Sequence, residues 1–145
     1  IFGVKSEFSQ VIISIVSNAI DVLKNIEKPK IGISISSNSA EVTISILDNG
    51  GGIKSKNIKK IFEPYFSTKE HGTGIGLYLS KMIIEESFSG KISVENQKEG
   101  ALFSLFIEKA LWFYGWTKDI FLITFKFSFK VFISMAIFSL SFGFV

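Results

Sequence analysis

Two glycine clusters are the parts of this sequence best suited to chemistry. The first reads Leu47-Asp48-Asn49-Gly50-Gly51-Gly52-Ile53, and the second reads Gly72-Thr73-Gly74-Ile75-Gly76-Leu77. Glycine lets the backbone come close to a ligand, and the N–H groups at the start of a helix attract anions. Because the second cluster leads into an amphipathic stretch, it predicts a loop that can hold a phosphate group.

Neither cluster matches two widespread nucleotide-binding loops. No Gly-Lys-Ser or Gly-Lys-Thr follows Gly72, which excludes a Walker A loop. No hydrophobic strand runs directly into this cluster and no second βαβ unit follows it, which excludes a Rossmann dinucleotide site.

The composition excludes several other classes of site. The 145 residues contain no cysteine and one histidine, His71, so a disulfide framework, a thiolate zinc site and a histidine cluster are excluded. Arginine is absent. Residues 1–108 carry 12 lysines against 12 acids, so the net charge of +3 comes from residues 109–145. Without a basic patch or guanidinium groups, we expect no nucleic-acid binding.

Hydrophobic periodicity predicts helices mixed with antiparallel strands. Apolar residues three and four apart predict helices over 9–24 and 75–86, and a short helix is expected over 57–62. Alternation predicts strands over 31–36, 41–47, 91–95 and 101–107, with a loop over 68–74. This order favours a two-layer α/β sandwich over a doubly wound parallel fold.

Four segments in order carry a family resemblance. They are Ser17-Asn18-Ala19-Ile20-Asp21, Asp48-Asn49-Gly50-Gly51-Gly52, Ile61-Phe62-Glu63-Pro64-Tyr65-Phe66-Ser67-Thr68-Lys69 and the second glycine cluster. Together they resemble the ATP-binding catalytic domain of bacterial two-component sensor histidine kinases, in the superfamily of gyrases, heat-shock chaperone ATPases and mismatch-repair ATPases. The resemblance covers about residues 9–107. It implies a Bergerat-type fold, an α/β sandwich with a mixed, mostly antiparallel sheet.

The resemblance implies ATP and Mg²⁺ as cofactors. Asn18 corresponds to the family's magnesium ligand, and an amide oxygen suits this hard cation. Asp48 corresponds to the acid that accepts a hydrogen bond from the adenine amine, which distinguishes adenine from guanine. Gly50 and Gly52 let the backbone lie close to the base. The alternative for Asp48 is a turn before Gly50.

The third and fourth segments correspond to a flexible ATP lid. Phe62 and Phe66 pack its base, and the glycines at 72, 74 and 76 hinge it. Lys69 is placed to reach a phosphate, or else it is a solvated lysine of the lid. His71 is expected to be a lid residue without a catalytic part. The implied nucleotide-binding set is Asn18, Asp48, Gly50, Gly52, Ile53, Phe66, Lys69, Gly72, Thr73, Gly74, Gly76 and Leu77.

Two departures limit the implied activity. Related kinases carry an Asn four residues before the magnesium ligand and hydrolytic relatives carry a Glu, but this chain has Ser14, which cannot act as a base for water. The phosphoacceptor histidine helix is missing.

We therefore expect the nucleotide-binding part of a signal-transducing histidine kinase, cytoplasmic or anchored in the membrane through its parent. Its partners would be a dimerisation domain that supplies the histidine and a downstream response regulator. The alternatives are a nucleotide-dependent switch, a serine kinase of the same fold, and an inactive remnant.

The last 37 residues have a different composition. Nine of the 16 phenylalanines and both tryptophans lie in residues 109–145, so we place a domain boundary between residues 108 and 109. Three interpretations stay open for this tail. It is a membrane-associated segment, an element that packs on the domain, or an unselected reading frame. Its apolar stretches are marginal for a full membrane span.

Overall fold

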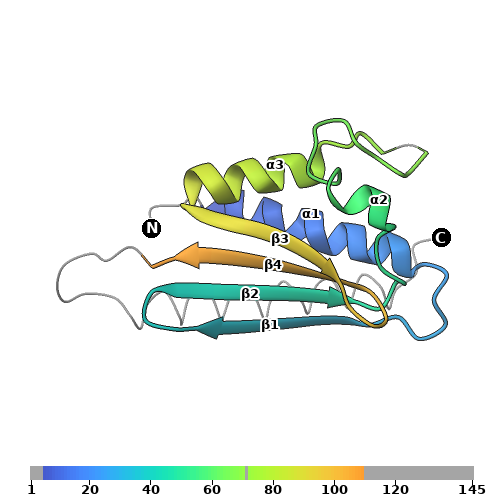
Figure 1. The fold of residues 1–145 in the computed structure, drawn as a ribbon, viewed down its shortest axis with the longest axis horizontal. Helices are drawn as coiled ribbons and strands as arrows, with labels where there is room; N and C mark the ends of the chain where they lie inside the picture. The colour runs from blue at the N-terminus through green and yellow to red at the C-terminus, as the bar shows by residue number, and fades with distance from the viewer. Residues whose placement is uncertain (1–4, 71, 110–145) are drawn as a thin grey trace. The chain divides into compact units, whose positions relative to one another are not determined.

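The chain is described by a computed structural model over residues 5–70 and 72–109 (Figure 1). Its elements are α1 (Lys5–Leu23), β1 (Ile31–Ser37), β2 (Glu41–Asp48), α2 (Ser55–Ile58), α3 (Gly76–Met82), the π-helical turn η1 (Ile83–Ser87), β3 (Gly90–Asn96) and β4 (Ala101–Glu108). The helices lie on one side of a four-stranded sheet (Figure 1). The two-layer α/β sandwich expected from the sequence is thus confirmed.

The sheet has the strand order β1-β2-β4-β3. All three pairings between these strands are antiparallel, so the described sheet has no parallel pair, whereas a mixed sheet was expected. On β2, Ile44 and Ile46 are buried, as are Phe103 and Leu105 on β4. This alternation gives the sheet one apolar face, which the helices cover.

The first helix follows the predicted apolar periodicity. Its buried residues are Val11, Ile12, Ile15, Ala19 and Leu23. It begins at Lys5 rather than Ser9 because tertiary contacts hold its first turn, where the rings of Phe8 and Phe88 lie 5.5 Å apart. By length and composition alone α1 could also cross a membrane, but its buried apolar face is that of a core helix.

The helix predicted over 57–62 is shorter than expected, and the helix predicted over 75–86 has the expected length but changes its hydrogen-bonding pattern midway. The helix predicted over 57–62 is α2, which ends at Ile58. The backbone then turns so that Ile61 is buried and the Phe62 ring packs edge-on against Phe103 at 6.5 Å. The helix predicted over 75–86 is α3 followed by η1, a wider turn that places Ile84 fully in the core.

The predicted tail, residues 109–145, lies outside the described residues except for Lys109. The backbone N–H of Lys109 donates to the Ala40 carbonyl at 2.7 Å. This bond continues the pairing of β2 with β4 by one residue. The boundary between residues 108 and 109 stays a prediction.

Candidate nucleotide-binding site

Asp48 ends β2 and is buried, with 6% of its surface exposed. Its Oδ1 accepts hydrogen bonds from the backbone N–H of Gly50 at 2.8 Å and of Ala101 at 3.3 Å. The second Asp48 oxygen, Oδ2, has no hydrogen-bond partner in the described part of the chain. Among the described residues, every side-chain oxygen or nitrogen that is fully buried does have a partner, so Oδ2 is not fully buried. Oδ2 is therefore an accessible acceptor, held in place by the two bonds to Oδ1. The turn before Gly50, the alternative for Asp48, therefore forms, and the adenine-binding role that the resemblance implies stays a prediction.

One face of α1 contacts three of the four sequence segments. Ser14, Asn18 and Val22 are four residues apart, so they lie on one stripe with about 6 Å between neighbours. A Cβ at Gly76 would lie 2.8 Å from Ser14 Oγ, and a Cβ at Gly50 would lie 2.5 Å from Val22. Asn18, between them, binds Lys69. The stripe brings both glycine clusters and the lid lysine to one side of α1.

Asn18 and Asp21 hold the Lys69 ammonium between two oxygens. The Lys69 Nζ donates to Asn18 Oδ1 at 2.7 Å and to Asp21 Oδ2 at 2.6 Å. Asp21 Oδ1 lies 2.8 Å from Lys24 Nζ. The hydrogen bond from Lys24 is the larger cause and that from Lys69 the smaller, and together they hold the pKa of the Asp21 carboxyl below its ordinary 3.8. The magnesium ligand expected at Asn18 thus already faces a cation.

The base of the lid is fixed by a close backbone approach at Gly74. This residue has φ +68°, and a Cβ there would lie 2.6 Å from the Phe66 nitrogen. Any side chain would therefore meet backbone that cannot turn aside. Phe66 is half-buried, as the family resemblance implies for a residue at the base of the lid.

The remaining predicted residues occupy more peripheral positions. Gly72 packs against the Ser67 side chain, Thr73 is exposed, and Leu77 is half-buried in the first turn of α3. His71, predicted to be a lid residue without a catalytic part, lies outside the described residues. No hydrogen bond or ion pair joins Thr73 or Leu77 to Asp48 or Asn18 in the described part of the chain.

Asn96 positions the end of the first glycine cluster, a role the sequence did not reveal. Its Oδ1 accepts from the Ile53 N–H at 2.8 Å, and its Nδ2 donates to the Ile53 carbonyl at 2.7 Å. Gly52, with φ +77°, lies so close that a Cβ would be 2.7 Å from the same Oδ1. The pair of bonds reproduces the pairing that a neighbouring strand would give.

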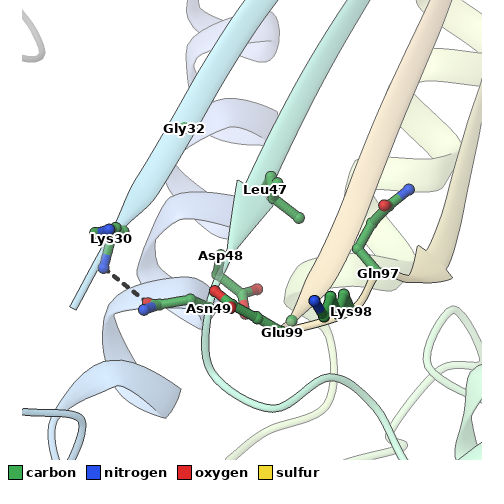
Figure 2. A pocket seen from close by; sticks show the side chains of 9 residues that line it. Lys30, Gly32, Leu47, Asp48, Asn49, Gln97, Lys98 and Glu99 are labelled. Carbon is green, nitrogen blue, oxygen red and sulfur yellow. Dashed lines mark hydrogen bonds between the residues drawn. The ribbon is translucent and has the colours of Figure 1, made fainter. Parts of the chain in front are cut away.

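A shallow hollow of about 340 Å³ lies at the same end of the sheet (Figure 2). It is lined by Lys30, Gly32, Leu47, Asp48, Asn49, Gln97, Lys98, Glu99 and Gly100. None of these residues comes from α1, the lid or α3. Leu47 alternates with the buried Ile46 and lies opposite Gly32 on the neighbouring strand, so the hollow opens on the sheet face away from the helices. Asp48, at the end of β2, also lines it and is shared with the predicted nucleotide-binding set, whereas Asn18 and Lys69 do not line it.

Asp21 was also missed as a site residue. Its signal was present, since it lies three residues after Asn18 on the same helix face. Gly100 lies against the Asp48 backbone. The sequence indicated a turn at Gly100 but did not predict this close approach.

Comparisons with known proteins identify the family of this chain. Residues 3–111 match the family described as histidine kinase-, DNA gyrase B-, and HSP90-like ATPase. The chain is 30% identical over 108 residues to the C4-dicarboxylate transport sensor protein DctB of Rhizobium meliloti, covering 74% of this chain and 17% of DctB. It is 36% identical over 100 residues to the sensor histidine kinase ZraS of Escherichia coli strain K12, covering 68% of this chain and 21% of ZraS. The chain thus spans about a fifth of the length of these two relatives.

A solved structure gives the same answer for the fold. A nucleotide-free form of the catalytic domain of histidine kinase ThkA superposes with a TM-score of 0.65 at 38% identity, covering 72% of this chain and 67% of that one. The resemblance to sensor histidine kinases is confirmed, and the chain belongs to the histidine kinase-, DNA gyrase B- and HSP90-like ATPase family.

Proposed function

We propose that this chain is the ATP-binding catalytic domain of a sensor histidine kinase. In the whole protein it would hold Mg-ATP and present the terminal phosphoryl group to a histidine on a separate dimerisation helix. The observation that carries the proposal is the stripe on α1, where Ser14, Asn18 and Val22 contact the start of α3, the lid lysine and the Asp48 loop.

The Asp48 geometry supports adenine as the base. Oδ1 is used by two backbone N–H groups, so the carboxylate cannot rotate freely and Oδ2 stays available. A fixed anionic acceptor suits the exocyclic amine of adenine and opposes the carbonyl that guanine carries at that position. Gly50 and Gly52 add no side chain where the base would approach.

The surroundings of Asn18 support a magnesium ion. The amide oxygen of Asn18 accepts from the Lys69 ammonium group, so this oxygen already faces a positive charge. Mg²⁺ prefers oxygen ligands and takes most of them from phosphates and water, so one protein oxygen suffices. When bound, ATP would supply the phosphoryl group, and Mg²⁺ would supply the positive charge that neutralises the phosphates. The residues of this chain would position the nucleotide and the metal.

Lys69 and the glycines around the lid would hold the phosphates. Gly74 sets the path of the backbone into α3, and Lys69 is near enough to Asn18 to reach a phosphate bound at that residue. Ser14, on α1, lies beside the start of α3 at the position where hydrolytic relatives carry a Glu, and its hydroxyl cannot act as a base for water. The domain is therefore expected to transfer phosphate to a partner rather than hydrolyse ATP.

The proposed partners and location follow from this role. The phosphoacceptor helix and a response regulator would complete the two-component pathway. The domain itself would act in the cytoplasm, where ATP is available.

Replacing the magnesium ligand tests the proposal. ADP should bind the full chain more tightly with Mg²⁺ than with EDTA in calorimetric titrations. We expect Asn18→Ala to lose that difference, because the oxygen that holds the metal is removed. Asn25→Ala is the matched control, since Asn25 is exposed just beyond the end of α1. An Asn18→Ala protein that keeps the full magnesium effect contradicts the assignment.

Phosphotransfer is tested separately. With labelled ATP alone, the full chain should gain no phosphohistidine, and with a dimerisation helix of a related kinase added, label should appear on that helix. Label on His71 of the isolated chain contradicts the proposed role.

A further inference from the structure

The Lys69 ammonium and a magnesium ion would need the same oxygen. Lys69 Nζ lies 2.7 Å from Asn18 Oδ1, and a magnesium ion on that oxygen would sit about 2.1 Å from it. Two cations on one amide oxygen would be within about 5 Å of each other, where they repel. The conformation with Lys69 on Asn18 therefore opposes magnesium binding at Asn18.

Asp21 holds Lys69 in that conformation. Its Oδ2 lies 2.6 Å from Nζ, and Asn18 and Asp21 together accept two of the three ammonium hydrogens. Asn18 alone offers a neutral acceptor, so the charge that attracts Lys69 comes from Asp21. We propose that Asp21 and Lys69 form a regulatory bridge that competes with Mg²⁺ for Asn18, so that Mg-nucleotide binds more tightly once Lys69 has left. This inference rests on the proposed function.

The bridge is built to open at little cost. Asp21 Oδ1 lies 2.8 Å from Lys24, so the carboxylate keeps one cationic partner when Lys69 departs. The Lys69 and Asp21 side chains are 42% and 32% exposed, and water can replace their contact. The released ammonium would then be free to bind a nucleotide phosphate, which is the second role expected of Lys69.

The bridge also ties the segment 65–70 to α1. Apart from this lysine, the described hydrogen bonds of residues 66–69 are local, such as Phe66 N–H to Glu63 and Lys69 N–H to Ser67. Releasing Lys69 would therefore loosen the segment together with the metal site, and the two changes can be measured independently.

Asp21→Asn and Asp21→Ala test the bridge in the full chain. The first keeps the shape of the side chain and removes its charge, and the second also removes the acceptor. In magnesium-free buffer, we expect the amides of residues 65–70 to exchange hydrogen for deuterium faster in both variants. Lys24→Gln is the matched control, because it breaks the other ion pair of Asp21 and leaves the bridge intact.

Mg-ADP affinity is the second readout. Without the bridge, Mg-ADP should bind roughly two- to fivefold more tightly to Asp21→Ala, the gain expected from an exposed ion pair that no longer competes. In EDTA the affinity gain of Asp21→Ala for ADP should be smaller than with Mg²⁺, because Lys69 is released toward the phosphates but no metal competes for Asn18. Lys24→Gln should show no gain.

Each contrary result has its own meaning. Unchanged exchange at residues 65–70 overturns the bridge, and weaker Mg-ADP binding in Asp21→Ala shows that Asp21 assists the metal rather than competing with it. If the wild-type chain binds no Mg-ADP, the proposed function is wrong. The proposed competition with magnesium is then wrong as well, even if hydrogen exchange shows that Asp21 holds Lys69.

Discussion

Asp48→Asn should separate the folding role of Asp48 from its proposed role in binding adenine. Oδ1 accepts from the Gly50 and Ala101 N–H groups, at 2.8 and 3.3 Å. An asparagine can keep its oxygen at that position, and these two donors orient the amide so that its NH₂ group replaces Oδ2. The variant would then present a donor to the adenine amine, which is itself a donor.

The expected loss follows from the bond removed. A hydrogen bond to a charged group contributes roughly 1.5–3 kcal/mol, so Mg-ADP should bind about 10- to 150-fold more weakly. Asp48→Ala is the comparison, because it removes Oδ1 as well and leaves two backbone donors without their acceptor. Its free energy of unfolding should fall by about 1–3 kcal/mol more than that of Asp48→Asn.

Calorimetric titration with Mg-ADP and urea unfolding of the full-length proteins measure both effects. The reasoning is refuted if Asp48→Asn binds Mg-ADP within twofold of wild type. It is also refuted if Asp48→Asn unfolds as easily as Asp48→Ala, since the oxygen then would not hold the loop.

Three further predictions concern backbone and charge. Gly74→Ala should weaken Mg-ADP binding at least about tenfold, because its Cβ would lie 2.6 Å from the Phe66 nitrogen; Gly51→Ala, also at positive φ but with open space around it, should affect binding much less. Asn96→Ala should lower the free energy of unfolding by about 1–2 kcal/mol in urea titrations, since two hydrogen bonds to Ile53 are lost, and an unchanged value contradicts its positioning role. Because the pKa of Asp21 is lowered below 3.8, its stabilisation is complete above that value and is lost as the pH falls through the lowered pKa, so the stability difference between wild type and Asp21→Ala should be constant from about pH 5 to 7 and shrink in stronger acid.

The sequence predicted those features that depend on local pattern. The apolar periodicity of α1 and the alternation of β2 and β4 report directly on one buried face, so these elements and the sandwich were predicted correctly. The ordered motifs also indicated the residues that α1 brings near one another. Element ends were less accurate, because the contact of Phe8 with Phe88 and the packing of Ile61 depend on tertiary structure.

The missed site residues have a common physical cause. Asn96 and Ile53 are 43 positions apart, and Lys69 and Asp21 are 48 apart, so no local pattern connects them. Asp21 could have been suspected from its place one turn after Asn18, but its partner was not predictable. The hydrogen bonds of Asn96 with Ile53 and of Lys69 with Asp21 form only once the sheet and α1 are assembled.

We expect this domain to bind an adenine nucleotide through Asp48 and Asn18. A calorimetric titration of the full chain with Mg-ADP beside Mg-GDP measures this directly. We expect saturable binding of one ADP per chain, with GDP bound at least about tenfold more weakly because Asp48 offers only an acceptor. No binding of ADP, or equal binding of the two nucleotides, would contradict it.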